Sequence, residues 1–289
     1  MIFTLAVAQT DSVPGNVTAN VRKHVEMAQR ALEQKANLIV FPELSLTGYS
    51  IKDMNWDLAI NLRRGSAALE PLLEISKSIS ILAGGVEEDD AFRIFNAAFL
   101  FEDGEVRSAH RKIYPPTYGM FEEMRYFSAG DAVRAAGSKF GKLGVLICED
   151  LWHISLPYIL ARDGAQIIIA LVASPSRLGG SEEGLRISIA NTENHKAYAR
   201  LLSSYVVFCN RVGFEDGINF WGGSTVVSPD GEVQCSAKLF EEDLLVARIN
   251  EDEVRRARQF SRHYLDDDAR LLMRELKRVM GSNSDSGLL

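Results

Sequence analysis

Residues 144–152 read GVLICEDLW, an apolar run that stops at a cysteine. Such a run is typical of a central strand that is covered on both faces of a sheet. A second apolar run, Ile167–Val172, follows after a stretch that predicts a helix around residues 156–162. Short apolar runs alternate with longer amphipathic stretches along most of the chain. This alternation predicts an α/β fold with mixed sheets and helices on the outside.

The same periodicity predicts the remaining elements. Two hairpins are expected, at the turn residues Asp103-Gly104 and around Pro229 to Gly231. No linker or fixed-period repeat interrupts residues 1–280, so we expect one domain there and a disordered polar tail, GSNSDSGLL, over residues 281–289. The other predicted strands are 2–9, 38–41, 79–86, 205–210 and 243–249, and the other predicted helices are 20–34, 66–78, 185–202, 251–259 and 266–280.

The composition of the 289 residues disfavours several classes of partner. The formal net charge is −7, so the chain has no global attraction to nucleic acid or to an anionic membrane surface. The longest largely apolar run, residues 165–173, is shorter than the roughly 20 residues of a membrane-spanning helix. The amino terminus, MIFTLAVAQTD, lacks the basic region of a signal peptide, and three cysteines are too few for a disulfide framework. We therefore expect a cytoplasmic protein.

Three reactive residues stand where apolar strands end. Glu43 follows one strand in NLIVFPELSLTGY (residues 37–49), Cys148 ends another, and Lys112 ends the second strand of the first hairpin. Taken singly, each has an ordinary explanation: a turn acid, a small buried hydrophobe and a solvated cation. Together they form a set for acyl transfer. A desolvated carboxylate can act as the base that a thiol needs, and a cation stabilises the oxyanion that forms when sulfur attacks a carbonyl or nitrile carbon.

At this point the sequence resembles the nitrilase superfamily of carbon–nitrogen hydrolases, over essentially residues 1–280. FPELSLTGY matches the glutamate motif at Glu43, HRKIYPPTYGMFEEMRYF the lysine motif at Lys112, and GVLICEDLW the cysteine motif at Cys148. The stretches ASPSR (residues 173–177) and CNRVGFEDGINFWGGSTVVSPDGEV (residues 209–233) are also similar to family signatures. The resemblance implies a four-layer αββα sandwich that carries a Glu–Lys–Cys triad.

The resemblance also implies further site residues and partners. It assigns a second catalytic glutamate to Glu123, with Glu122 as the alternative if the register shifts by one. The oxyanion would also be held by the backbone N–H of Glu149. Family members usually pair, so we expect a homo-oligomer, a dimer or higher, with a small-molecule amide substrate. The substrate-binding residues that we expect are Glu149, Trp152, Tyr49 and Tyr118, although core packing explains Trp152 nearly as well.

Within the superfamily, YPPTYGMFEEMRYF, CEDLW and ASPS most resemble the glutamine-amidase domain of NAD synthetases and stand-alone amidases. Glu149-Asp150 follow the cysteine, whereas nitrilases usually show Trp-Glu there. Because no SGGxDS-like loop occurs, we expect that the chain is not a complete synthetase. The expected activity is a thiol amidohydrolase that converts a non-peptide carboxamide to acid and ammonia through a thioester. The alternatives are a nitrilase, an N-carbamoyl amino acid hydrolase, a partner-dependent glutaminase subunit and a non-catalytic binding protein.

Two rival chemistries have less support. His110 and His153 lie near the motifs and would serve a Cys–His hydrolase, but neither has an evident Asn or Asp partner at a matching motif. The histidines show no HxH or HxxxH spacing, so no metal is expected. Gly179-Gly180 and Gly222-Gly223 do not open a helix as phosphate loops do, and we read them as backbone turns. We therefore expect no cofactor.

Overall fold

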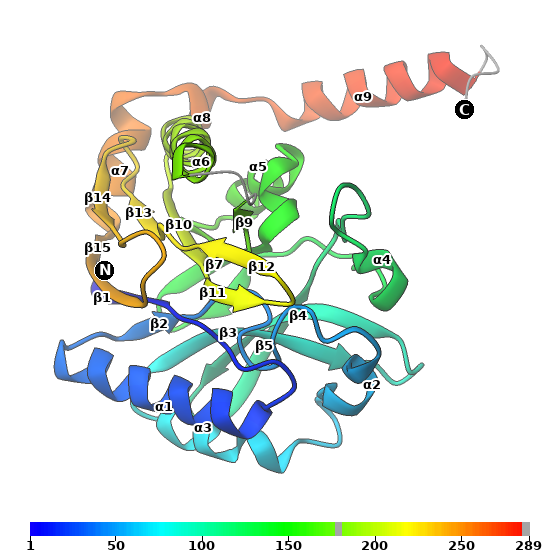
Figure 1. Cartoon of the computed structure of the whole chain (residues 1–289). Coiled ribbons are helices and arrows are strands. Elements are labelled where there is room, and N and C mark those ends of the chain that lie inside the picture. Colours follow the sequence, from blue (N-terminus) through cyan, green and yellow to red (C-terminus); the bar gives the residue numbers. More distant parts are fainter. Residues whose placement is uncertain (177–180, 285–289) are drawn as a thin grey trace.

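Two six-stranded mixed sheets form the centre of the computed structural model, which describes residues 1–176 and 181–284 (Figure 1). The first sheet has the order β15 (Asp243–Asn250), β1 (Ile2–Gln9), β2 (Leu38–Val40), β3 (Ser80–Glu88), β4 (Ile94–Glu102), β5 (Glu105–Arg111). The second has the order β14 (Val233–Ser236), β13 (Thr225–Val227), β10 (Tyr205–Asn210), β8 (Ile167–Val172), β7 (Gly141–Ile147), β6 (Ala136–Ser138). In each sheet the central strands run parallel and the outer pairs are antiparallel.

The apolar strands divide their side chains between two layers of core. In β1, Leu5 and Val7 belong to the core between the sheets, whereas Ala6 and Ala8 belong to the core under the first pair of helices. This division follows from the alternation of side chains along a strand. Because both faces are covered, both sets of positions are apolar, as predicted for central strands.

Helices cover the outer face of each sheet (Figure 1). On the first sheet these are α1 (Val17–Glu33) and α3 (Glu70–Ile75), and on the second they are α5 (Ser155–Arg162) and α6 (Ser181–Leu202). The result is the four-layer αββα sandwich with mixed sheets that the sequence predicted, and the prediction of the fold class is confirmed.

A third, three-stranded sheet was not predicted. It consists of β11 (Val212–Glu215), β12 (Ile218–Trp221) and β9 (Pro175–Ser176). Its strands are short and lack a clean alternation of apolar and polar residues, so the sequence pattern does not reveal them. Two short helices lie in connecting segments: α2 (Asn55–Leu58) between β2 and β3 of the first sheet, and α4 (Glu123–Tyr126) between β5 of the first sheet and β6 of the second.

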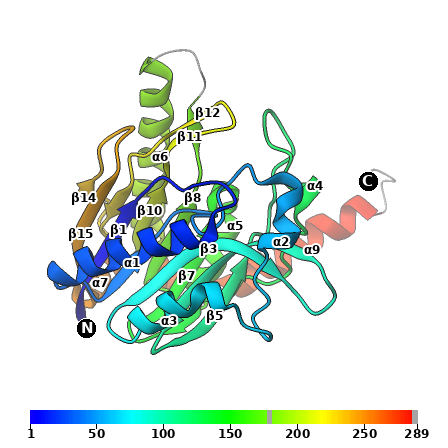
Figure 2. The ribbon, with the colours of Figure 1, turned by 60° about the horizontal axis from the view of Figure 1, so that its bottom comes forward.

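The C-terminal region differs from the prediction. After α7 (Glu251–Phe260), the helix expected over residues 266–280 is α9 (Ala269–Ser284), which starts three residues later than predicted, and the short helix α8 (His263–Asp266) before it was not predicted. The Asp268 carboxylate accepts the N–H groups of Arg270 and Leu271, which caps a new helix start. Helix α9 projects from the body of the protein and continues to Ser284, so residues 281–284 are helical where a disordered tail was expected (Figure 2). Residues 285–289 lie outside the described residues.

Among residues 1–176 and 181–284, no helix combines the length and the apolar composition that crossing a bilayer requires.

Candidate active site

Glu43 lies in the turn that follows β2 and is fully buried. Its Oε1 accepts hydrogen bonds from Lys112 Nζ and from Asn96 Nδ2, each at 2.8 Å, and its Oε2 accepts the backbone N–H of Ala173 at 2.8 Å. The turn presses against β3 at Gly84, where an added Cβ would lie 2.6 Å from the Pro42 carbonyl oxygen. Both carboxylate oxygens are therefore held by partners from three other segments.

Lys112 directly follows β5, and its side chain is fully buried. The Nζ atom donates to Oε1 of Glu43 and to Oε1 of Glu123, each at 2.8 Å. Burial works to lower the pKa of Lys112, but the carboxylates of Glu123 and Glu43 outweigh burial and raise this pKa well above its usual value. The side chain is thus a buried ammonium ion between two carboxyl groups.

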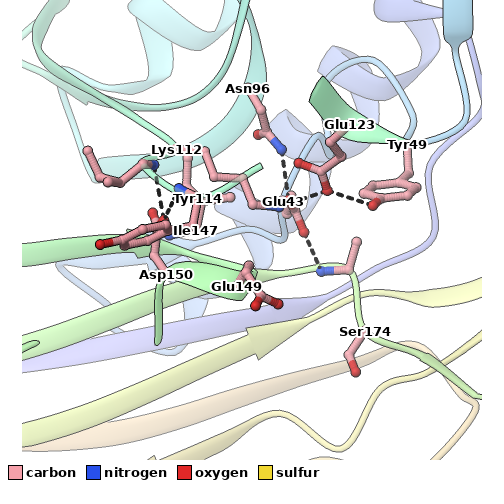
Figure 3. Close-up of polar contacts among 12 residues, drawn as sticks. Glu43, Tyr49, Asn96, Lys112, Tyr114, Glu123, Ile147, Glu149, Asp150 and Ser174 are labelled. Carbon is pink, nitrogen blue, oxygen red and sulfur yellow. Dashed lines mark hydrogen bonds and ion pairs between the residues drawn. The ribbon is translucent and has the colours of Figure 1, made fainter. Parts of the chain in front are cut away.

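Glu123 is the first residue of α4 and is buried, whereas Glu122 is exposed. The structure therefore brings Glu123, and not Glu122, to the cluster. Its Oε1 accepts the Tyr49 hydroxyl at 2.6 Å as well as Lys112 (Figure 3), while its Oε2 is buried and has no hydrogen-bond partner. Burial raises the pKa of Glu123, Lys112 opposes this shift, and Glu43 adds to it.

Cys148 follows the last residue of β7 and starts a 3₁₀ turn, Cys148–Trp152. Its φ of 47° lies in the left-handed region, which a residue with a side chain adopts only where the surroundings enforce it. Burial raises the pKa of the Cys148 thiol well above its usual value, Glu43 and Glu123 add to this, and Lys112 opposes it. The thiol therefore keeps its proton at neutral pH and lies within the electrostatic reach of all three charged residues.

A pocket adjoins Cys148 beneath α6. It is lined by Cys148, Trp152, Ser174, Asn191, Tyr198 and neighbouring apolar residues. Trp152 is 51% exposed at this pocket, so core packing does not explain it. The Ser174 hydroxyl accepts the indole N–H of Trp221 at 2.9 Å, which makes Trp221 a buried support for the pocket wall.

Glu149 directly follows the nucleophile in the chain, and its partner Tyr118 is exposed. The Tyr118 hydroxyl donates to Oε2 of Glu149 at 2.7 Å, and burial together with this carboxylate raises the pKa of Tyr118 to about 12. His153 Nε2 is 3.7 Å from Oε1 of Glu149, and its ring stacks on Tyr114 with the centroids 3.5 Å apart. In the described part of the chain, no lysine or arginine forms an ion pair with Glu149.

The histidines that would serve a Cys–His hydrolase are engaged elsewhere. His110 Nε2 hydrogen-bonds to Asp150 at 3.2 Å, and the charges that act on the thiol are those of Glu43, Lys112 and Glu123. The described residues contain no group of three His, Cys, Asp or Glu side chains arranged to hold a metal ion.

Sequence reasoning missed three contributors to this site: Asn96, Asp150 and the backbone N–H of Ala173. Asn96 gave a signal, because it is the one polar residue in the apolar strand IFNAAFLF. Asp150 lies two residues after the nucleophile and is fully buried. Ala173 and Ser174 of the ASPSR stretch reach the site. Arg177 of the same stretch and the pair Gly179-Gly180, which the sequence predicted to be a turn, lie outside the described residues.

The comparisons with known proteins identify the family of this chain. The family model "Carbon-nitrogen hydrolase" matches residues 4–259. A glutamine-dependent NAD(+) synthetase from Acinetobacter baylyi is 32% identical over 253 residues, which cover 88% of this chain and 45% of the synthetase. The chain thus spans somewhat less than half the length of that relative.

Solved structures show the same likeness. The carbon-nitrogen hydrolase from Helicobacter pylori G27 has a TM-score of 0.86 at 25% identity and covers 96% of this chain and 99% of its own. A mutant amidase from Nesterenkonia sp. AN1 has a TM-score of 0.76 at 25% identity, covers 94% of this chain and 96% of its own, and carries the acetamide moiety of fluoroacetamide on its active-site cysteine. Because the family model spans most of its length, this chain belongs to the carbon-nitrogen hydrolase family of the nitrilase superfamily, as its three strand-end motifs predicted.

Proposed function

We propose that this protein is a thiol amidohydrolase that cleaves a non-peptide carboxamide to a carboxylic acid and ammonia. The observation that carries the proposal is the buried contact of Lys112 with both Glu43 and Glu123, whose charges all act on the thiol of Cys148. A base, a cation and a nucleophile are then available at one point, which is what acyl transfer requires.

The first step is the attack on the amide. Because the pKa of Cys148 is raised, the nucleophile starts as a thiol, and Glu43 takes its proton as sulfur bonds to the carbonyl carbon. The carbonyl electron pair moves to oxygen. An ammonium has three N–H donors, and Lys112 gives two of them to carboxylates, so the third can donate to this oxyanion together with the backbone N–H of Glu149.

Two further steps complete the reaction. Glu43 returns its proton to the amide nitrogen, the C–N bond breaks, and ammonia leaves a thioester on Cys148. Glu43 then takes a proton from water, the hydroxide adds to the thioester carbon, and the C–S bond breaks as the sulfur regains the proton. The unpartnered Oε2 of Glu123 can accept an N–H of the substrate or an O–H of this water. Tyr49 contributes by holding the other oxygen of Glu123.

The substrate class that we favour is an amide whose acyl part carries an ammonium group, such as glutamine. Glu149 offers a carboxylate beside the nucleophile, oriented by the Tyr118 hydroxyl, and a cationic group of the substrate would bind there. Trp152 provides an apolar wall on the pocket side. The match to glutamine-dependent NAD(+) synthetases supports this preference.

We also propose that the enzyme acts in the cytoplasm as a homo-oligomer, a dimer or higher, with residues 1–280 as its catalytic domain and without a metal or cofactor. The free thiols of Cys148, Cys209 and Cys235 suit a reducing compartment. The exposed apolar residues of α9, such as Leu272 and Leu276, suit an association surface.

The test is ammonia release by the wild type and by Cys148→Ala from glutamine, aliphatic and aromatic amides, nitriles and N-carbamoyl amino acids. Cys235→Ala is the matched control, because this cysteine lies on β14. We expect release from an amide by the wild type and the control, and none by Cys148→Ala. Release only from nitriles or carbamoyl compounds would assign another branch of the family. A silent wild type would favour a partner-dependent subunit or a binding protein.

A further inference from the structure

Asp150 connects the two segments that carry Cys148 and Lys112. Its carboxylate is fully buried and accepts four hydrogen bonds. Figure 3 shows Asp150 next to two of the donor residues, Ile147 and Tyr114. Oδ1 accepts the backbone N–H groups of Ile113 and Tyr114, each at 3.0 Å. Oδ2 accepts the backbone N–H of Ile147 at 3.1 Å and Nε2 of His110 at 3.2 Å.

Two of the donors to the Asp150 carboxylate are direct chain neighbours of the two reactive residues. Ile113 immediately follows Lys112, and Ile147 immediately precedes Cys148. One oxygen therefore holds the lysine segment and the other holds the cysteine segment. Because a carboxylate is rigid and planar, these bonds fix the spacing between two segments that belong to different sheets.

The bond to Ile147 also stabilises the strained turn at the nucleophile. Cys148 has a φ of 47°, and such a conformation persists only where its surroundings over-determine it. The Asp150 side chain reaches back to the N–H at the start of the 3₁₀ turn, as the acidic residue of a capping box does. This hydrogen bond joins the residue before Cys148 to the residue two positions after it, and so constrains the backbone on both sides of the nucleophile.

His110 completes the arrangement. It lies on β5 two residues before Lys112, and its bond to Oδ2 supplies the fourth donor to a carboxylate that has lost all contact with water. A buried carboxylate is tolerated only where hydrogen bonds replace its hydration. The histidine that a Cys–His mechanism would use as a base thus acts on Asp150 instead.

We propose that Asp150, oriented by His110, is a positioning residue that sets the distance between the Cys148 thiol and the Lys112 ammonium. This inference rests on the proposed function for the roles of those two residues. An asparagine has one acceptor oxygen, so its NH₂ group would face either the Ile147 N–H or the N–H groups of Ile113 and Tyr114. Asp150→Asn therefore breaks the link between the lysine segment and the cysteine segment, while the volume of the side chain stays nearly constant.

The experiment compares wild type, Asp150→Asn and Glu102→Gln. Glu102 is the matched control, because its carboxylate is also buried and accepts hydrogen bonds from Ser80 Oγ at 2.9 Å and from the Lys139 N–H at 3.4 Å. It lies six residues along β4 from Asn96, which places it about 20 Å from that site residue. For Asp150→Asn we expect kcat to fall by about 100-fold with little change in KM. We also expect alkylation of Cys148 by iodoacetamide at pH 7, followed by peptide mass spectrometry, to slow by roughly 10-fold. Glu102→Gln should lose stability without either change.

A folded Asp150→Asn with wild-type kcat and alkylation rate would overturn the proposal and leave Asp150 a structural residue. If Asp150→Asn does not fold, His110→Gln decides: it keeps Asp150 but removes the ring, and kcat and alkylation should each fall several-fold, whereas wild-type values would refute the proposal. If the wild type releases no ammonia, the proposed function fails, but the alkylation rates still show whether Asp150 positions Cys148.

Discussion

The Nζ atom of Lys112 lies 2.8 Å from Oε1 of Glu43, and both side chains are fully buried although 69 residues separate them in the chain. Water cannot solvate either charge, so each depends on the other and on Glu123. The stability of the fold and the proposed chemistry therefore share the same three residues, so a substitution at any of them can change both.

Replacing the buried ammonium should cost both stability and activity. In Lys112→Met the carboxyl groups of Glu43 and Glu123 lose their cation, and breaking a buried pair in this way typically costs about 3–5 kcal/mol. We expect this loss in urea unfolding at pH 7, together with no ammonia release. Lys139→Met is the control, because the Lys139–Asp103 pair is exposed and should contribute little. Equal losses in the two variants would contradict the prediction.

Removing the second carboxylate should make the thiol easier to ionise. The negative charge of Glu123 helps to raise the pKa of Cys148, so Glu123→Gln should lower that pKa and move the pH dependence of iodoacetamide alkylation to lower pH. Ammonia release should fall in the same variant. The adjacent, exposed Glu122→Gln should alkylate as the wild type does. A shift to higher pH in Glu123→Gln would show that the charge of Glu123 does not act on the thiol.

A methyl group at Gly84 should displace Glu43. The added Cβ would lie 2.6 Å from the Pro42 carbonyl oxygen and closer still to the Leu44 nitrogen, and these backbone atoms flank Glu43. We expect Gly84→Ala to lose ammonia release by on the order of 100-fold and to be less stable. Gly137→Ala on β6 is the control, because nothing lies within 4 Å of its added Cβ. Equal activity of the two alanine variants would contradict the prediction, because it would show that the close approach of β3 to the turn does not position Glu43.

Two buried histidines should make the protein sensitive to acid. Burial lowers the pKa of His24 to about 4 and that of His195 to about 3, from the usual 6.5. Below pH 6.5 the unfolded chain binds protons at these positions and the folded chain does not. Stability should therefore be complete above pH 6.5 and fall as the pH decreases toward 4 and then 3, by up to about 1.4 kcal/mol per pH unit for each histidine.

The measurement is urea unfolding between pH 7 and pH 4.5. His195→Gln should have a shallower pH dependence than the wild type, whereas the exposed His263→Gln should keep the wild-type slope. An unchanged slope in His195→Gln would mean that this histidine takes up its proton equally well in the folded and unfolded chain.

Local patterns in the sequence determined most of the framework. The predicted strands Ile2–Gln9, Ile167–Val172 and Tyr205–Asn210 have the observed bounds, because uninterrupted apolar runs and turn residues are signals that neighbouring residues carry. The helix predicted over residues 66–78 was too long. Its α-helical part is Glu70–Ile75, preceded by a 3₁₀ turn, because Pro71 has no N–H to donate and is suited only to the first turn.

The sequence by itself also singled out Glu43, Lys112 and Cys148, since each of them stands where an apolar strand ends, and the family resemblance added Glu123. Only the tertiary structure decided what holds them: Asn96 and the Ala173 N–H on Glu43, and Asp150 between the lysine and cysteine segments. These partners depend on which strands lie side by side and on how two sheets pack together. The bonds from Asn96 and Ala173 to Glu43 and from Ile113 to Asp150 join residues 37 to 130 positions apart, and no local pattern in the chain encodes them. Only the bond from Ile147 to Asp150 is local, because it spans three residues.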